Sequence, residues 1–145
     1  MSRTFPEGWH PPVVEHNNPT EWQWTVLHPE AFTLGRHTDI GAYTLIQAGA
    51  GVTVEDDVQI GNHCSVMSID TISNKHGPVL IQKGARIGMH SAIMPGITVG
   101  AGAVVGAFSF VNRDIPAGEM WFGVPADTAA LPKVKRKLFT FEKHR

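Results

Sequence analysis

Aliphatic residues recur along most of this chain at intervals of six, with one large interruption. The series runs through Leu34, Ile40 and Ile46, then Val54, Ile60, Val66 and Ile72, and after the interruption Ile81, Ile87, Ile93, Val99, Val105 and Val111. A period of six fits neither an amphipathic helix, which repeats every about 3.6 residues, nor plain strand alternation. It fits a short strand followed by a turn, with three such units closing one triangular coil. The pattern predicts a solenoid of stacked coils in which these aliphatic side chains point inward.

Small residues and glycines follow the same period. A small or modest side chain stands four residues after most of the aliphatics, at Thr38, Thr44, Ala50, Val58, Cys64, Ala85, Ser91, Ala103 and Ser109. Glycine often follows the aliphatic directly, at Gly35, Gly41, Gly61, Gly88, Gly100 and Gly106. The first set fits a second inward position in a narrow interior, and glycine accepts the backbone angles that a corner demands.

Two spacings between successive aliphatic residues depart from the six-residue period. Ile46 and Val54 are eight residues apart, which predicts a two-residue bulge at Gly51–Thr53, and Val66 and Ile81 are fifteen apart, three more than the period requires. Three repeats per coil give coils at 34–51, 54–71, 81–98 and 99–116. A sandwich of short strands has no reason to keep this period over so many units. We therefore expect an all-β parallel solenoid of about four to five coils at residues 28–116, with a loop at residues 68–80.

The two ends of the chain lack the repeat. Residues 1–27 are proline-rich and irregular, and we expect them to cap the open end of the first coil, with Trp22 and Trp24 as anchors. Residues 117–145 form a closing segment and a short basic tail or helix. The tail is either solvated or a contact for phosphate groups.

Composition narrows the function. The chain has 145 residues, a net charge of −1 and one cysteine. Nothing in the charge indicates a nucleic acid partner, and no apolar run reaches the ~20 residues of a transmembrane segment. The N-terminus lacks the apolar region of a signal peptide, and a lone free thiol is typical of the cytoplasm. We expect a cytoplasmic protein of one domain.

The segment GARIGMHSAIMPGITVGAGAVVGAFSFVNRDIPAGEMWFGVPA resembles the hexapeptide-repeat acyltransferases. Val111 to Pro116, followed by Gly123 to Ala126, is similar to the closing signature of that family. The resemblance covers about residues 28–130 and implies a left-handed parallel β-helix, acetyl-CoA as co-substrate, and a homotrimer with its active site between neighbouring prisms. It implies transfer of an acetyl group to a hydroxyl or amine of a sugar or nucleotide-linked amino sugar.

Bulky apolar residues near the end of the repeats agree with an oligomer. They are Met94, Phe108, Phe110, Trp121 and Phe122, more than a narrow prism can hold inside. Some of them therefore face outward, and exposed apolar patches usually mark a partner surface.

The interruption at Ser68–Leu80 is the expected catalytic loop. In the resembled family a loop at this location often carries the catalytic histidine, and here it contains His76 and Asp70. A histidine of near-neutral pKa can take a proton from an acceptor hydroxyl or ammonium, and a carboxylate can hold the imidazole. We expect His76 at the loop tip, assisted by Asp70. The alternative is an ordinary polar loop residue, with the acceptor arriving as a free amine.

The resemblance also assigns contacts for coenzyme A. The positions that match the family's coenzyme contacts are Met89, Ala107, Asn112 and Arg113. Arg113 stands where a basic residue can meet the nucleotide phosphates. A further basic contact of the family falls at Ala130, so Lys133 or Lys135 would have to substitute.

His63 and His90 form a second candidate site. They take the same place in adjacent coils, with Tyr43 and Phe108 beyond them, and could bind a ligand, a metal or a neighbouring subunit. A γ-class carbonic anhydrase on the same prism is one alternative function, but Pro95 stands where its second histidine belongs and Met94 is no zinc ligand, so we expect no metal. A non-catalytic scaffold is the other alternative.

Overall fold

The computed structural model describes residues 8–128 as short strands on three faces of a prism. Face 1 contains β1 (Thr25–Leu27), β4 (Leu45–Gln47), β7 (Ser65–Met67), β12 (Ala92–Ile93) and β15 (Phe110–Val111). Face 2 contains β2 (Phe32–Leu34), β5 (Val52–Val54), β10 (Val79–Ile81) and β13 (Thr98–Val99). Face 3 contains β3 (Asp39–Ile40), β6 (Gln59–Ile60), β11 (Arg86–Ile87), β14 (Val104–Val105), β16 (Met120–Gly123) and β17 (Ala126–Asp127).

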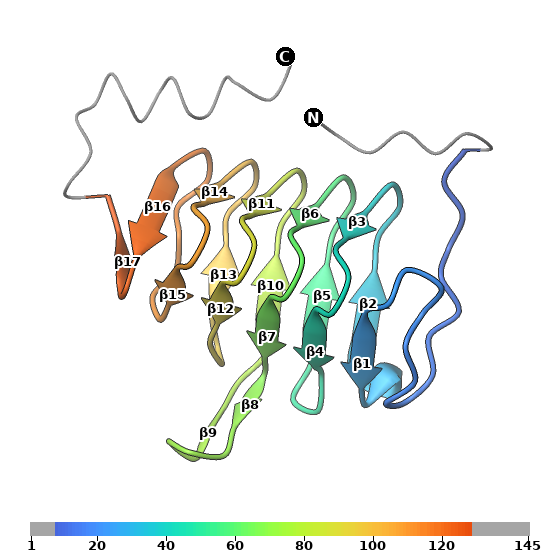
Figure 1. The fold of residues 1–145 in the computed structure, drawn as a ribbon. Helices are drawn as coiled ribbons and strands as arrows, with labels where there is room; N and C mark the ends of the chain where they lie inside the picture. Colours follow the sequence, from blue (N-terminus) through green and yellow to red (C-terminus); the bar gives the residue numbers. More distant parts are fainter. Residues whose placement is uncertain (1–7, 129–145) are drawn as a thin grey trace.

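The chain visits the three faces in the same order in every coil. All neighbouring strands on a face are parallel, except that β17 returns antiparallel to β16. Face 1 has five strands, and on face 2 an isolated parallel bridge from Val99 to Ile115 continues the stack into the last coil. Figure 1 shows these coils side by side from the N-terminal to the C-terminal end. The expected all-β, left-handed parallel β-helix is confirmed. No helix within residues 8–128 is long and apolar enough to cross a membrane.

The six-residue period correctly identified the inward stacks. Val66 pairs with both Ile46 and Ile93, and equivalent pairings run through the other two faces. Almost all of these aliphatics are buried. Leu34 is partly buried, whereas the side chain of Ile72 is 94% exposed, so the expected place of Ile72 inside a coil is wrong. It falls on the period by coincidence, because the chain has already left the prism at this point.

The expected bulge at Gly51–Thr53 also lies elsewhere. Val52 and Thr53 are regular members of β5, paired with strands on both sides. The two additional residues are taken up before β5, in the turn at residues 48–51, which joins face 1 to face 2. In the first coil the same corner holds the 3-10 turn η1 (Pro29–Ala31). This corner is therefore wide in the first coils.

The corner between face 3 and face 1 has a buried polar lining. Thr44, Cys64, Ser91 and Ser109 are each at most 3% exposed. Their side chains donate hydrogen bonds to main-chain carbonyls, for example from Thr44 Oγ1 to Gly61 O at 2.8 Å and from Ser109 Oγ to Gly106 O at 2.6 Å. Buried polar atoms paired in this way cost little stability.

The coils extend slightly beyond both expected boundaries. β1 begins at Thr25 and pairs with β4, and β16 continues face 3 as far as Gly123. At the N-terminal end the chain crosses the edge of β1, where Asn17 N donates to Val26 O at 2.8 Å, and Trp24 is buried. The expected basic tail lies outside the described residues, as do Ala130, Lys133 and Lys135.

Candidate active site

The interruption in the repeat forms a β-hairpin that projects from the corner between faces 1 and 2 (Figure 1). Its strands are β8 (Ile69–Asp70) and β9 (Lys75–His76), which pair antiparallel, with Ile69 opposite His76 and Asp70 opposite Lys75. His76 therefore lies at the base of the hairpin, and the sequence-based placement of this residue at the loop tip is wrong. The tip is the turn at residues 71–74.

Asp70 organises that turn. Its carboxylate accepts a hydrogen bond from Ser73 Oγ at 2.6 Å and another from Ile72 N at 3.1 Å. The hydrogen bond from the Ser73 hydroxyl, together with that from the Ile72 amide, holds the pKa of Asp70 below its usual range. Side chains of this kind commonly close turns by bonding to the main chain two residues on. The carboxylate thus holds the tip in shape.

Asp70 and His76 lie on opposite sides of the hairpin. Residues directly opposite in an antiparallel pair share a side, so His76 lies beside Ile69, while Asp70 lies beside Lys75. A Cβ placed on Gly49 would meet Ile69 Cδ1 at 2.6 Å, so that side packs toward the turn of the preceding coil. The structure therefore does not bring the expected Asp70–His76 pair together within one chain.

The base of the hairpin is fixed by a buried serine that the sequence analysis did not single out. Ser68 is fully buried, and its Oγ donates to Gln47 O at 2.6 Å and accepts from Ala50 N at 2.9 Å. Ser68 O accepts from Gly77 N at 2.9 Å, which closes the hairpin. His76, immediately before Gly77, is consequently exposed on a well-anchored strand.

The expected coenzyme contacts divide into two groups. Met89 and Ala107 lie next to each other at the corner between faces 3 and 1, where Phe108 N donates to Met89 O at 2.9 Å. Gly88 leaves them close together, because a Cβ on it would lie 2.5 Å from Ala107 N. Asn112 and Arg113 follow β15 at the next corner.

Arg113 already has partners. Its Nη2 lies 3.2 Å from Asp127 Oδ2 and 3.4 Å from Ala126 O, and its guanidinium carbon lies 4.8 Å from the centroid of the Trp121 ring. The side chain is 54% exposed. Arg113 therefore holds the closing hairpin against the last coil, a role that the sequence did not indicate.

The expected histidine column is present and continuous. The rings of His63 and His90 are 4.7 Å apart with planes 2° from parallel, and Phe108 extends the stack at 5.0 Å from His90. The ring of Tyr43 lies 5.1 Å from that of His63 at a tilt of 40°. Asn62 Nδ2 lies 3.0 Å from His63 Nδ1. A metal ion lies near the plane of each imidazole that binds it, so two parallel stacked rings cannot share one ion in this arrangement. Residues 8–128 contain no group of three or more side chains placed to hold a metal.

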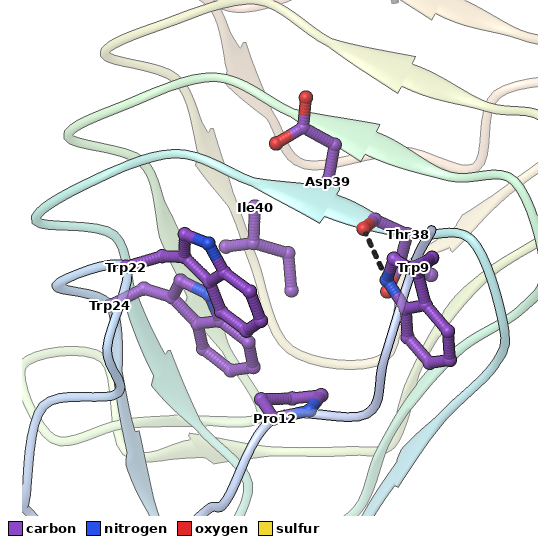
Figure 2. A pocket seen from close by; sticks show the side chains of 7 residues that line it. All are labelled: Trp9, Pro12, Trp22, Trp24, Thr38, Asp39 and Ile40. Carbon is purple, nitrogen blue, oxygen red and sulfur yellow. Dashed lines mark hydrogen bonds between the residues drawn. The ribbon is translucent and has the colours of Figure 1, made fainter. Parts of the chain in front are cut away.

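A small cavity lies under the N-terminal segment and is lined by aromatic residues (Figure 2). Trp9, Trp22 and Trp24 surround it, and Trp9 Nε1 donates to Thr38 O at 3.0 Å. Its volume is about 10 Å³, which is room for roughly one water molecule. This cavity serves the packing of the cap and is too small for a substrate.

Comparison with known proteins agrees with this fold. Residues 78–113 match the family model described as bacterial transferase hexapeptide (six repeats). A serine acetyltransferase from Buchnera aphidicola is 35% identical over 100 residues, which are 69% of this chain and 36% of that protein. A UDP-3-O-acylglucosamine N-acyltransferase from Caulobacter is 35% identical over 75 residues, 52% of this chain and 21% of that protein. The chain thus spans less than half the length of these relatives.

Two solved structures show the same architecture. A hexapeptide-repeat acetyltransferase from Vibrio cholerae, complexed with acetyl coenzyme A, is 27% identical with a TM-score of 0.67, over 72% of this chain and 62% of that one. A mutant of the N-acyltransferase AntD from Bacillus cereus, complexed with dTDP-4-amino-4,6-dideoxyglucose and coenzyme A, is 27% identical with a TM-score of 0.65, over 84% of this chain and 73% of that one. These matches confirm the resemblance to hexapeptide-repeat transferases.

Proposed function

Because its coils carry the hexapeptide repeat of bacterial transferases, we propose that this protein is an acyltransferase that moves an acetyl group from acetyl-CoA to a small polar acceptor. The acceptor class that we propose is a sugar or a nucleotide-linked amino sugar. The observation that carries the proposal is the hairpin, an anchored excursion from an otherwise regular prism that presents an exposed histidine. Relatives and similar structures described as acetyl- or acyltransferases support it.

In the proposed reaction His76 acts as the base. Its neutral imidazole takes the proton from the acceptor hydroxyl or ammonium, and the freed oxygen or nitrogen attacks the thioester carbonyl carbon. The tetrahedral intermediate then collapses, the carbon–sulfur bond breaks, and the imidazolium returns the proton to the leaving thiolate. Asp70 acts here as a positioning residue, because its carboxylate is used by the turn that shapes the hairpin.

The proposed coenzyme contacts are those at the two corners of the last coils. Met89 is 44% exposed and lies beside Ala107, so both can contact the pantetheine arm. Asn112 lies next to Arg113, whose hydrogen bond and ion pair within residues 8–128 involve only Nη2, which leaves other N–H groups for a phosphate. The carboxylate of Asp127 offsets part of the positive charge of Arg113, so a second cation would strengthen coenzyme binding.

We also propose that the protein works as a homotrimer in the cytoplasm. Face 1 carries apolar outward side chains, including Leu27, Leu45, Met67 and Phe110, that are only partly buried within one chain. Phe108 is 60% exposed, whereas Trp121 turns inward and is 9% exposed. A second copy on these surfaces would bury them. The hairpin could then present His76 to a site completed by that copy. The free thiol of Cys64 favours the cytoplasm.

The direct test measures thiol release from acetyl-CoA by the full chain with a panel of nucleotide-linked amino sugars, nucleotide-linked sugars and free sugars. We expect turnover with at least one nucleotide-linked amino sugar and none without an acceptor. Calorimetry with coenzyme A alone checks the donor half independently. Absence of coenzyme A binding and of turnover with every acceptor in the panel would contradict the proposed function.

A further inference from the structure

Face 3 carries a shallow groove that is separate from the hairpin. Its volume is about 300 Å³, within the range of small-molecule sites. Asp39, Gln59, Arg86 and Val104 line it along β3, β6, β11 and β14, with Gly61 and Gly88 at the corner. The β-strands that form its floor run along one side of the prism in Figure 1. Because the floor is regular sheet, its outward side chains are held in fixed register.

Arg86 is the one positive charge among the residues that line this groove. No residue among 8–128 makes a hydrogen bond or ion pair with its guanidinium, although the side chain is partly buried. Burial lowers the pKa of Arg86, and no neighbouring carboxylate counteracts this effect. A guanidinium that has lost part of its hydration without gaining a carboxylate is well suited to an anion supplied from outside.

Gln59 lies directly beside Arg86. The two residues are paired across β6 and β11, so their side chains stand on the same outward side of the sheet. The side-chain amide of Gln59 also has no hydrogen-bond partner among the described residues. Together the two side chains offer the planar fork of a guanidinium and an amide N–H, a donor set that matches the oxygens of a phosphate group.

Asp39 places a negative charge at the far end of the same groove. It lies on β3, opposite Gln59 and thus two strands from Arg86, a separation of about 10 Å at the usual strand spacing. At that distance its repulsion of a phosphate at Arg86 is weak in a solvent-exposed groove. The groove is therefore positive at the β11 end only.

We propose that Arg86 and Gln59 bind a phosphate group of a nucleotide ligand. This inference rests on the proposed acyl transfer, in which the coenzyme and a nucleotide-linked acceptor both carry phosphates. Arg113, the cation that the sequence assigned to this role, is held by Asp127 and Trp121, whereas Arg86 lies in a groove with no ion-pair partner within residues 8–128. Arg86 is thus the better placed of the two to gain a phosphate partner.

The test is calorimetric titration of the full chain with pyrophosphate, coenzyme A and UDP, each separately. Arg86→Gln should lower the affinity about tenfold or more for each of these probes that the parent binds at Arg86. Arg86→Lys should retain part of it, because it keeps the charge but not the fork. Arg36→Gln, an exposed arginine outside the groove, is the matched control and should bind like the parent. A loss confined to coenzyme A assigns the site to the donor, and a loss confined to UDP assigns it to the acceptor.

Thermal unfolding of the ligand-free variants provides the structural control. Arg86→Gln should unfold no more easily than the parent, because it removes a partly desolvated charge that has no partner in the described part of the chain. If Arg86→Gln binds all three probes as the parent does, the inference is overturned. It is also overturned if Arg86→Gln weakens oligomer assembly or lowers stability without weakening binding, because Arg86 would then pair with a second copy. If the parent binds pyrophosphate through Arg86 but neither binds nor uses coenzyme A, the site stands and the proposed function fails.

Discussion

The guanidinium carbon of Arg113 lies 4.8 Å from the centroid of the Trp121 ring, and the same side chain meets Asp127. Trp121 is an inward side chain at the C-terminal end of face 3, directly after Val105 in the stack. Arg113 therefore covers the end of the interior and ties β17 to it. Arg113, which the resemblance assigns to coenzyme binding, therefore also stabilises the folded chain.

The first prediction follows from this contact. Arg113→Gln should lower the free energy of unfolding by about 0.5–1.5 kcal/mol, through loss of the cation–π contact and of a half-exposed ion pair. Arg36→Gln, an exposed arginine, should stay within about 0.5 kcal/mol of the parent. Urea unfolding followed by tryptophan fluorescence measures both. Equal stability of the two variants would show that the Trp121 contact contributes nothing.

The second prediction concerns the turn at the hairpin tip. The hydroxyl of Ser73 and the amide of Ile72 lower the pKa of the Asp70 carboxyl from 3.8. A carboxyl whose pKa is depressed in the folded state stabilises that state above its unfolded pKa, and this stabilisation is lost as the pH falls through the lower, folded value. The hairpin should therefore remain ordered at neutral pH and loosen in strong acid. NMR titration of the Asp70 carboxyl should give a midpoint below 3.8 in the parent.

Ser73→Ala supplies the control for that titration. It removes the hydrogen bond that lowers the pKa of Asp70 the most, so the midpoint of Asp70 should move back toward the ordinary value. An identical midpoint in the parent and in Ser73→Ala would mean that the hydroxyl does not hold the carboxylate in solution.

The third prediction tests the proposed base. His76→Ala should lower turnover by about 10²-fold or more with little change in the Michaelis constant for acetyl-CoA, because a base acts chiefly in the transition state. Lys75→Ala is the matched control, since Lys75 is the neighbouring residue of β9 and lies on the other side of the hairpin. It should retain turnover within a few-fold of the parent.

The shape of the pH profile separates this assignment from its main alternative. If the acceptor arrives as a free amine, turnover depends on the pKa of the acceptor, and His76→Ala keeps both the rate and the pH dependence of the parent. If His76 is the base, the variant loses the limb of the profile that belongs to the imidazole. A fully active His76→Ala enzyme rules out the base assignment.

The sequence predicted the prism well because the interior of a narrow coil admits few alternatives. An inward position must be aliphatic in every coil, as Ile46, Val66 and Ile93 are, so the period is visible without a structure. Outward positions obey no such rule. The partners of Arg113 depend on the return of β17, and the side of the hairpin on which His76 lies depends on strand register. Arg86 could have been noticed from sequence as the cation among the equivalent positions Asp39, Gln59 and Val104, but its lack of a partner could not.

The last prediction tests the inward register at Cys64. This residue is 1% exposed, its thiol donates to Gly88 O at 3.3 Å, and burial raises its pKa above 9.0. Cys64→Leu should lower the free energy of unfolding by about 1–3 kcal/mol, because the added volume has no room between the coils. Cys64→Ser should be much milder, because Ser91 and Ser109 occupy the equivalent places and bond to carbonyls in the same manner. The parent thiol should react slowly with an alkylating reagent in the native state and rapidly in denaturant, since a neutral buried thiol is a poor nucleophile. Rapid native labelling, with Cys64→Leu as stable as the parent, would place Cys64 outside the prism and shift the register of its coil.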